Sequence, residues 1–192
     1  MRYSRFAKKT APECRYGPVR AAQALKELAC RTEVPLFPLL FQPYFDDLFS
    51  AIKARINGDL VIPTMPSRYV AADKEGVLAV VSLLYAALCA KRGNVPLRVE
   101  ENRESVCLLM ELGDLDMALL LGKEDSLLSL LRSVARNSGI SLSVTESSPS
   151  YLCLRFERYL SVVQVAHAET EACFYASEGM ARYLSLVSRL SF

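Results

Sequence analysis

The stretch that most constrains the fold is residues 74–91, which predict one long helix that is apolar nearly all round. Asp73 stands where a helix N-cap is expected, and Gly93 follows the helix as a stop. The interior from Val77 to Cys89 has no continuous polar side. A helix of this kind is buried on several sides in a folded protein. We therefore expect other elements of the chain to cover residues 74–91 on more than one side.

The hydrophobic periods along the rest of the chain predict a regular series of elements. The segment "EVPLFPLLFQP" is too rich in proline for a long helix and is interpreted as an apolar connector. Further helices are predicted at 18–31, 44–56 and 123–139, strands at 59–63, 95–101, 105–112, 140–146 and 151–159, a possible further strand at 161–166, and a terminal helix from 169. The last four of the firm strands pair in sequence as two hairpins.

This order predicts an α+β fold, a two-layer α/β sandwich with a mixed β-sheet and helices on one face. Helical additions are expected at both ends of the chain. We divide the chain into an N-terminal helical segment with the connector (1–43), a central domain (44–160) and a C-terminal strand and helix extension (161–192). The connector and the terminal helix either cover the core of the domain or form a dimer or partner surface.

Composition limits the classes of function. The 192 residues are 52% hydrophobic and 23% charged, which suits a folded domain with a full core. No apolar run reaches about 18 residues, so no membrane span is expected. The start of the chain does not resemble a secretory signal, and Met1 favours a whole protein over the tail of a receptor. The net charge of +2 indicates no nucleic-acid partner.

The cysteines favour a cytoplasmic protein with reduced thiols. They are scattered and form no C-x-x-C pair, and the chain holds a single histidine, so no zinc site is expected. The six positions are Cys14, Cys30, Cys89, Cys107, Cys153 and Cys173.

Two segments resemble the ATP-binding domain of sensor histidine kinases and related GHKL ATPases. "VAADKEGVLAVVSLLYAALCAK" is similar to the family helix that closes with an "NLLxNA" signature. "LLSLLRSVARNSGISLSVTE" resembles the last helix and the following strand of that family, and "YLCLRFERY" stands in the place of its final strand. The resemblance covers residues 44–160 and implies the sandwich described above and a role in two-component signal transduction.

The chain departs from the family at the residues that bind Mg-ATP. In "SLLYAA", Ser82 and Ala86 stand at the two asparagine positions, where the resemblance implies a magnesium ligand. A methyl group offers that ion no oxygen. The family's "DxGxG" element has only Asp114 as a counterpart, followed by Leu115 and Asp116 in place of flexible residues. Asp114 is a candidate for reading the adenine, or else a solvated residue at the start of a loop.

The glycine-rich phosphate loop of the family is also missing. In its place stands "GKEDSLL", where Gly122 remains and Lys123 could contact phosphate, but Glu124 and Asp125 would repel it. Only a short segment separates Asp114 from Gly122, which is too little for a closing lid.

The phosphoacceptor is missing as well, because His167 is the only histidine and follows the domain. We therefore expect a signalling-related pseudo-histidine kinase: not an enzyme, with no catalytic residues, no metal and no cofactor, acting through a protein partner or a homodimer. The alternative is a divergent histidine kinase or ATPase that binds Mg-ATP through Ser82, Asp114, Gly122 and Lys123. A third possibility is an unrelated α+β regulatory or scaffold domain.

Overall fold

The computed structural model describes residues 18–32, 34–55, 60–113, 126–145, 147–159 and 182–187. Its helices and strands follow the predicted order closely. They are α1 (Pro18–Cys30), β1 (Phe37–Leu40), α2 (Phe41–Lys53), β2 (Tyr69–Ala72), α3 (Lys74–Arg92), β3 (Leu97–Glu101), β4 (Ser105–Glu111), α5 (Ser126–Asn137), β5 (Ile140–Val144) and β6 (Tyr151–Glu157). Residues 182–187 add a short helical turn, which we call the C-terminal turn.

The main sheet has four strands in the order β3-β4-β6-β5, and β1 and β2 form a separate two-stranded ladder. Every strand pairing among the described residues is antiparallel, so the predicted mixed sheet is wrong. The reason is that β3-β4 and β5-β6 are hairpins, and the strands β4 and β6 that join the two hairpins also run antiparallel to each other. A bridge between Val70 and Arg158 connects β2 to the end of β6.

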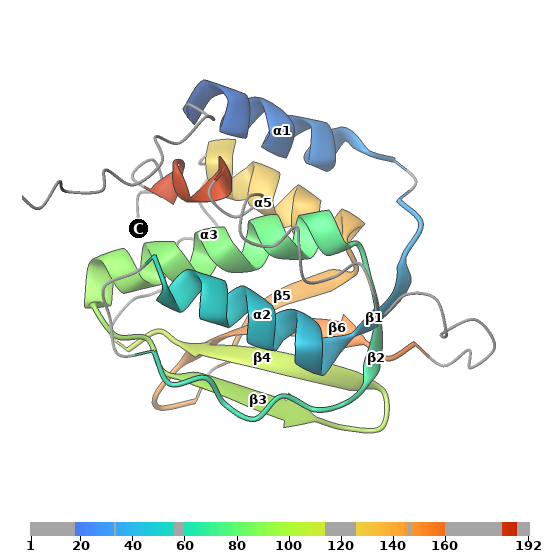
Figure 1. Ribbon diagram of the computed structural model, residues 1–192, viewed down its shortest axis with the longest axis vertical. Helices are drawn as coiled ribbons and strands as arrows, with labels where there is room; N and C mark the ends of the chain where they lie inside the picture. Colours follow the sequence, from blue (N-terminus) through green and yellow to red (C-terminus); the bar gives the residue numbers. More distant parts are fainter. Residues whose placement is uncertain are drawn as a thin grey trace, which may run out of the picture.

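The helices α2, α3 and α5 lie on one side of the four-stranded sheet, and α1 lies beyond α5 on the outside (Figure 1). The predicted α+β fold class, with helices on one face of a sheet, is therefore confirmed. The side chains that face the helices are apolar at alternate strand positions, as period-two burial requires. They include Val106, Leu108 and Met110 of β4 and Leu152, Leu154 and Phe156 of β6.

The prediction for α3 is confirmed, because every residue from Gly76 to Cys89 is buried. On one side α3 meets α2, whose phenylalanines also reach the sheet. Phe41 and Phe45 stack with ring centroids 4.1 Å apart, and both rings meet Phe156 of β6 edge to face. These aromatic contacts fix α2 against the sheet and close the core.

Two local predictions are wrong. Residues 60–63 are not a strand: they pair with no other strand, and the Val61 side chain is 78% exposed. The strand is instead β2, in "YVAA", and its partner is β1 from within the predicted connector. The helix predicted at 44–56 begins earlier, at Phe41, because Pro43 in its first turn has no helical N–H to lose. The predicted strand at 161–166 and most of the terminal helix lie outside the described residues.

Candidate functional site

The candidate site begins at the N-terminus of α3, which is clamped to the end of α5. The Asp73 carboxylate caps the helix and accepts a hydrogen bond from the Gly76 N–H at 2.9 Å. The Asp73 N–H donates to the Ser138 carbonyl oxygen at 3.2 Å. A β-carbon on Gly76 would lie 1.6 Å from the Ser138 Oγ, so only glycine allows this close approach. These contacts hold the start of α3 in one position relative to α5.

One face of α3 carries the positions where the resemblance implies nucleotide and magnesium binding. Glu75, Ala79, Ser82 and Ala86 are spaced by four, three and four residues, so they share one face of the helix, which we call the α3 face. Ala79 and Ser82 are fully buried and Ala86 is 5% exposed. The Ser82 hydroxyl donates to the Leu78 carbonyl oxygen of its own helix. The α3 face therefore does not fit a magnesium ion, because its one hydroxyl is buried and already bonded.

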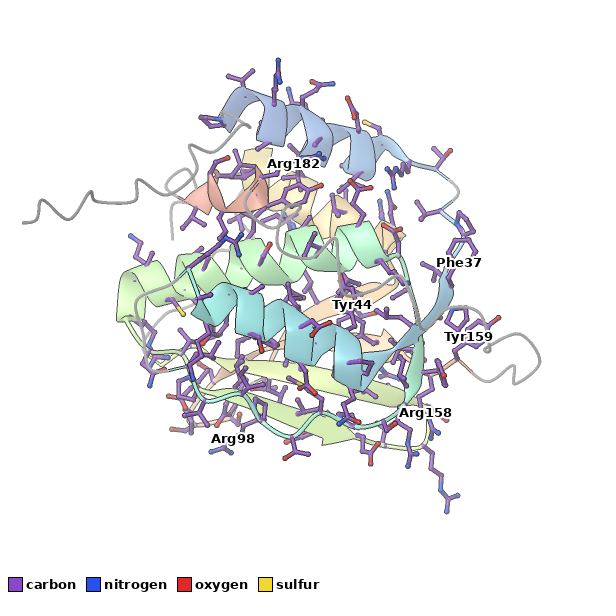
Figure 2. All side chains as sticks on the ribbon, in the orientation of Figure 1. Phe37, Tyr44, Arg98, Arg158, Tyr159 and Arg182 are labelled. Atoms are coloured by element: carbon purple, nitrogen blue, oxygen red, sulfur yellow. The ribbon has the colours of Figure 1, made fainter. Side chains whose placement is uncertain are left out.

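Glu75 lies at the end of the α3 face and receives contacts from both ends of the described chain. Its carboxylate lies 3.1 Å from the Arg31 guanidinium, which follows α1. From the C-terminal turn, Arg182 lies 3.8 Å from the same carboxylate and the Tyr183 hydroxyl donates to it at 3.4 Å. Figure 2 shows Arg182 in the space between α1 and α3. We call Glu75, Arg31, Arg182 and Tyr183 the Glu75 cluster.

Apolar burial attaches the C-terminal turn to the core. Tyr183 is 1% exposed, Leu186 is fully buried, and both belong to the main core. Burial, and then the neighbouring Glu75 carboxylate, raise the pKa of Tyr183 to about 12. The hydroxyl therefore stays protonated at neutral pH and serves as a hydrogen-bond donor. The turn is consequently an integral part of the structure beside the α3 face.

Two further tyrosines near α3 are structural. The Tyr44 hydroxyl donates to the Lys74 carbonyl oxygen at 2.6 Å, and the Tyr85 hydroxyl donates to the Val95 carbonyl oxygen at 3.1 Å. Burial raises the pKa of both groups, with the Asp73 charge a second cause at Tyr44. Neither hydroxyl is suited to act as a base, because each stays protonated and bonded to the backbone.

The end of β4 is the other side of the region that the resemblance assigns to the nucleotide. The Arg92 guanidinium donates to the Glu111 carbonyl oxygen at 2.6 Å and lies 3.5 Å from the Glu111 carboxylate. A β-carbon on Gly113 would lie 2.6 Å from the same guanidinium. Arg92 thus ties the end of α3 to the end of β4. Asp114, the next residue, lies outside the described residues.

Of the predicted nucleotide-binding residues, the structure places Ser82 alone. Gly122 and Lys123, like Asp114, lie outside the described residues, as do the acids Glu124 and Asp125. His167 does so too.

Sequence reasoning missed the Glu75 cluster. Glu75 itself could have been found, because it stands seven residues before Ser82 and so shares its helix face. Its partners gave no such signal, since Arg31 is 44 residues away in sequence and Tyr183 is 108.

In the described ranges, no group of three or more His, Cys, Asp or Glu side chains is arranged to hold a metal ion. Among the same residues, no helix combines the length and the apolar character needed to cross a bilayer. Comparison with known proteins finds no family model that matches the chain and no match among curated proteins.

Proposed function

We propose that the chain is a non-catalytic module of cytoplasmic signalling, derived from a histidine-kinase-like ATPase domain and working through protein contacts. Three features support the kinship. From α2 to β6 the order of helices and strands follows the order that the resemblance implies, the helices lie on one face of the sheet, and the segment similar to the family's signature helix forms α3. The antiparallel sheet and the added strand β1 depart from that pattern. In this proposal the domain keeps the sandwich and has lost the binding of Mg-ATP.

The burial of the α3 face carries the proposal. A nucleotide site needs an open surface with oxygen ligands and positive charge for phosphates. Here Ser82 is fully buried with its hydroxyl bonded, and the acidic Glu75 stands at the end of the same face, 3.1 Å from Arg31. The α3 face therefore offers a phosphate no free hydroxyl, and it ends in a carboxylate.

Thermal unfolding with and without Mg-ATP tests the proposal. A ligand at about a hundred times its dissociation constant stabilises the native state by roughly 2.7 kcal/mol. In a domain of this size each kcal/mol moves the midpoint by about 2–4 °C, so a true ligand shifts it by roughly 5–11 °C. We expect no shift with magnesium, ATP or both.

A magnesium-dependent shift would instead support the divergent enzyme. In that case Asp114→Asn and Lys123→Ala should abolish the shift, because these side chains are the remaining candidates for adenine and phosphate contacts. Ser82→Ala then tests the remaining candidate of the alternative: the shift should persist if the hydroxyl stays buried and bonded within its helix, and should fall if Ser82 takes part in binding.

The proposed contact surface is the start of β1. Leu36 is 39% exposed and Phe37 is 59% exposed, whereas Leu39 is 2% exposed and belongs to the core. Figure 2 shows Phe37 at the margin of the molecule, away from the helical layer. One part of the predicted connector therefore covers the core, and we propose the exposed apolar part as the surface that a partner contacts.

The backbone edge of β1 is unsuited to adding a further strand. Hydrogen-bonded pairs alternate along an antiparallel ladder, and the Phe41 N–H bonds inward to the Arg68 carbonyl oxygen at 2.8 Å. By that alternation Pro38 falls at an outward position, where it has no N–H to offer. A partner should therefore contact the side chains of Leu36 and Phe37 rather than extend the sheet.

Analytical ultracentrifugation of the wild type and of Phe37→Ser over a wide concentration range tests this surface. Self-association that Phe37→Ser weakens would show a homodimer at β1. Equal self-association of both proteins would place the interface elsewhere and refute this surface.

A further inference from the structure

The face of the sheet that points away from the helices carries a small apolar cluster of its own. Leu109 of β4 and Tyr151 and Cys153 of β6 are 5%, 7% and 8% exposed, and Cys107 packs against them. Arg98 of β3 lies opposite Leu109, and its guanidinium lies 5.3 Å from the centre of the Tyr151 ring. Figure 2 shows Arg98 on this outer side of the sheet. We call Cys107, Leu109, Tyr151 and Cys153 the outer cluster.

The outer cluster brings two thiols together from adjacent strands. In the β4-β6 ladder Cys107 stands opposite Arg155, and Leu109 stands opposite Cys153. Cys107 and Cys153 are therefore diagonal neighbours on the same face of the sheet. Both side chains belong to the same small apolar cluster on this face. The two other described cysteines lie elsewhere, Cys30 exposed at the end of α1 and Cys89 buried in α3.

The two thiols differ in their access to solvent. Cys107 is half-buried, whereas Cys153 is buried. Burial, and then the neighbouring Cys107, raise the pKa of Cys153 to about 11. Cys107 is therefore the thiol that a reagent in solution reaches first, because it is the more exposed of the two. Cys153 is placed to react second, with whatever has bonded to the Cys107 sulfur.

The diagonal arrangement also sets the kind of disulfide that can form. Diagonal neighbours have Cα atoms about 7–8 Å apart, and a disulfide requires no more than about 6.8 Å. The backbone around the two cysteines must shift locally to close the bond. A bond made in this way is more readily reduced than a relaxed structural disulfide, which suits a reversible modification in a reducing compartment.

We propose that Cys107 and Cys153 form a reversible dithiol–disulfide pair that is oxidised by a low-molecular-weight disulfide. The Cys107 thiolate attacks the small disulfide, forms a mixed disulfide and releases one small thiol. Cys153 then loses its proton and attacks the Cys107 sulfur, which forms the internal bond and releases the second small thiol. Overall, two protein thiols are oxidised to one disulfide and one small disulfide is reduced to two thiols.

Peptide mapping after equilibration in glutathione redox buffers tests the proposal on the intact protein. Trypsin releases residues 104–123 with Cys107 as the one cysteine, and residues 137–155 with Cys153 as the one cysteine. After acid quenching and alkylation of free thiols, we expect the linked pair of these peptides to appear as the fraction of oxidised glutathione rises. Adding a dithiol reductant should remove it completely.

Two variants and one condition make the test decisive. In Cys153→Ser the linked peptide should be lost and Cys107 should stop at the mixed disulfide with glutathione. In Cys107→Ser, Cys153 should take up glutathione several-fold more slowly than Cys107 does in Cys153→Ser. Failure of the linked peptide to form in the most oxidising buffer would overturn the proposal. So would equal yields from the native and the urea-unfolded chain, because the sheet would then not be what positions the thiols.

Discussion

The replacement of Leu186 by alanine is the sharpest test of how the C-terminal turn is held. Leu186 is fully buried in the main core, so the substitution removes buried methyl groups and leaves a cavity. Such changes cost about 2–5 kcal/mol, and we expect about 3 kcal/mol here. In a domain of this size that corresponds to a fall in the unfolding midpoint of roughly 6–12 °C.

Glu75→Gln is the matched comparison, because it removes the charge that links the turn to α3 and changes little else. The Glu75 side chain is 42% exposed, and those of Arg31 and Arg182 are 43% and 29% exposed. Ion pairs with this exposure contribute no more than about 1 kcal/mol. Apolar burial should therefore outweigh the Glu75 cluster severalfold in the free energy of unfolding.

Urea unfolding followed by circular dichroism measures both variants, and the chain has no tryptophan to serve as a fluorescent probe. Equal m-values would show that both variants unfold from the same compact state. The reasoning is refuted if Glu75→Gln costs as much as Leu186→Ala, or if Leu186→Ala remains within about 0.5 kcal/mol of the wild type. The first result would make the charged cluster the main attachment of the turn, and the second would show that the turn is not docked in solution.

Three further predictions concern the clamp at α3 and the alkaline limit of stability. Gly76→Ala should lower the free energy of unfolding by about 1–3 kcal/mol, because its β-carbon would lie 2.6 Å from the Ser138 Cβ. The same substitution in a Ser138→Gly background should cost clearly less. Equal costs in the two backgrounds would argue against the clash. Asp73→Ala should cost about 1 kcal/mol through loss of the cap, and Asp73→Asn should restore most of it in the same urea assay. Folding raises the pKa of Cys153 from 9.0 to about 11 and the pKa of Tyr183 from 10.0 to about 12. The stability that these two protonated groups contribute is therefore fully present below pH 9 and is lost as the pH rises through 9–11 for Cys153 and 10–12 for Tyr183. The free energy of unfolding, measured under reducing conditions at a series of pH values, should show this decline, and Cys153→Ala should flatten the first range and Tyr183→Phe the second.

The sequence by itself determined the features that depend on near neighbours. The apolar interior of residues 77–89 required a helix covered on several sides, and Asp73 marked its beginning. The apolar runs in 105–111 and 151–157 predicted two strands, each part of a hairpin, and both are strands of the four-stranded sheet. These predictions succeed because helix and strand periods place residues two to four apart on one face, whatever the rest of the chain does.

The tertiary structure alone decided which distant segments meet. The strand "YVAA" is too short to stand out and is stabilised by β1, some thirty residues earlier in the chain. The contact of Glu75 with Tyr183 and the diagonal contact of Cys107 with Cys153 depend on how α3, the C-terminal turn and the β4-β6 ladder assemble. No local pattern encodes such contacts, because each forms only after a long loop has closed and the whole core has packed.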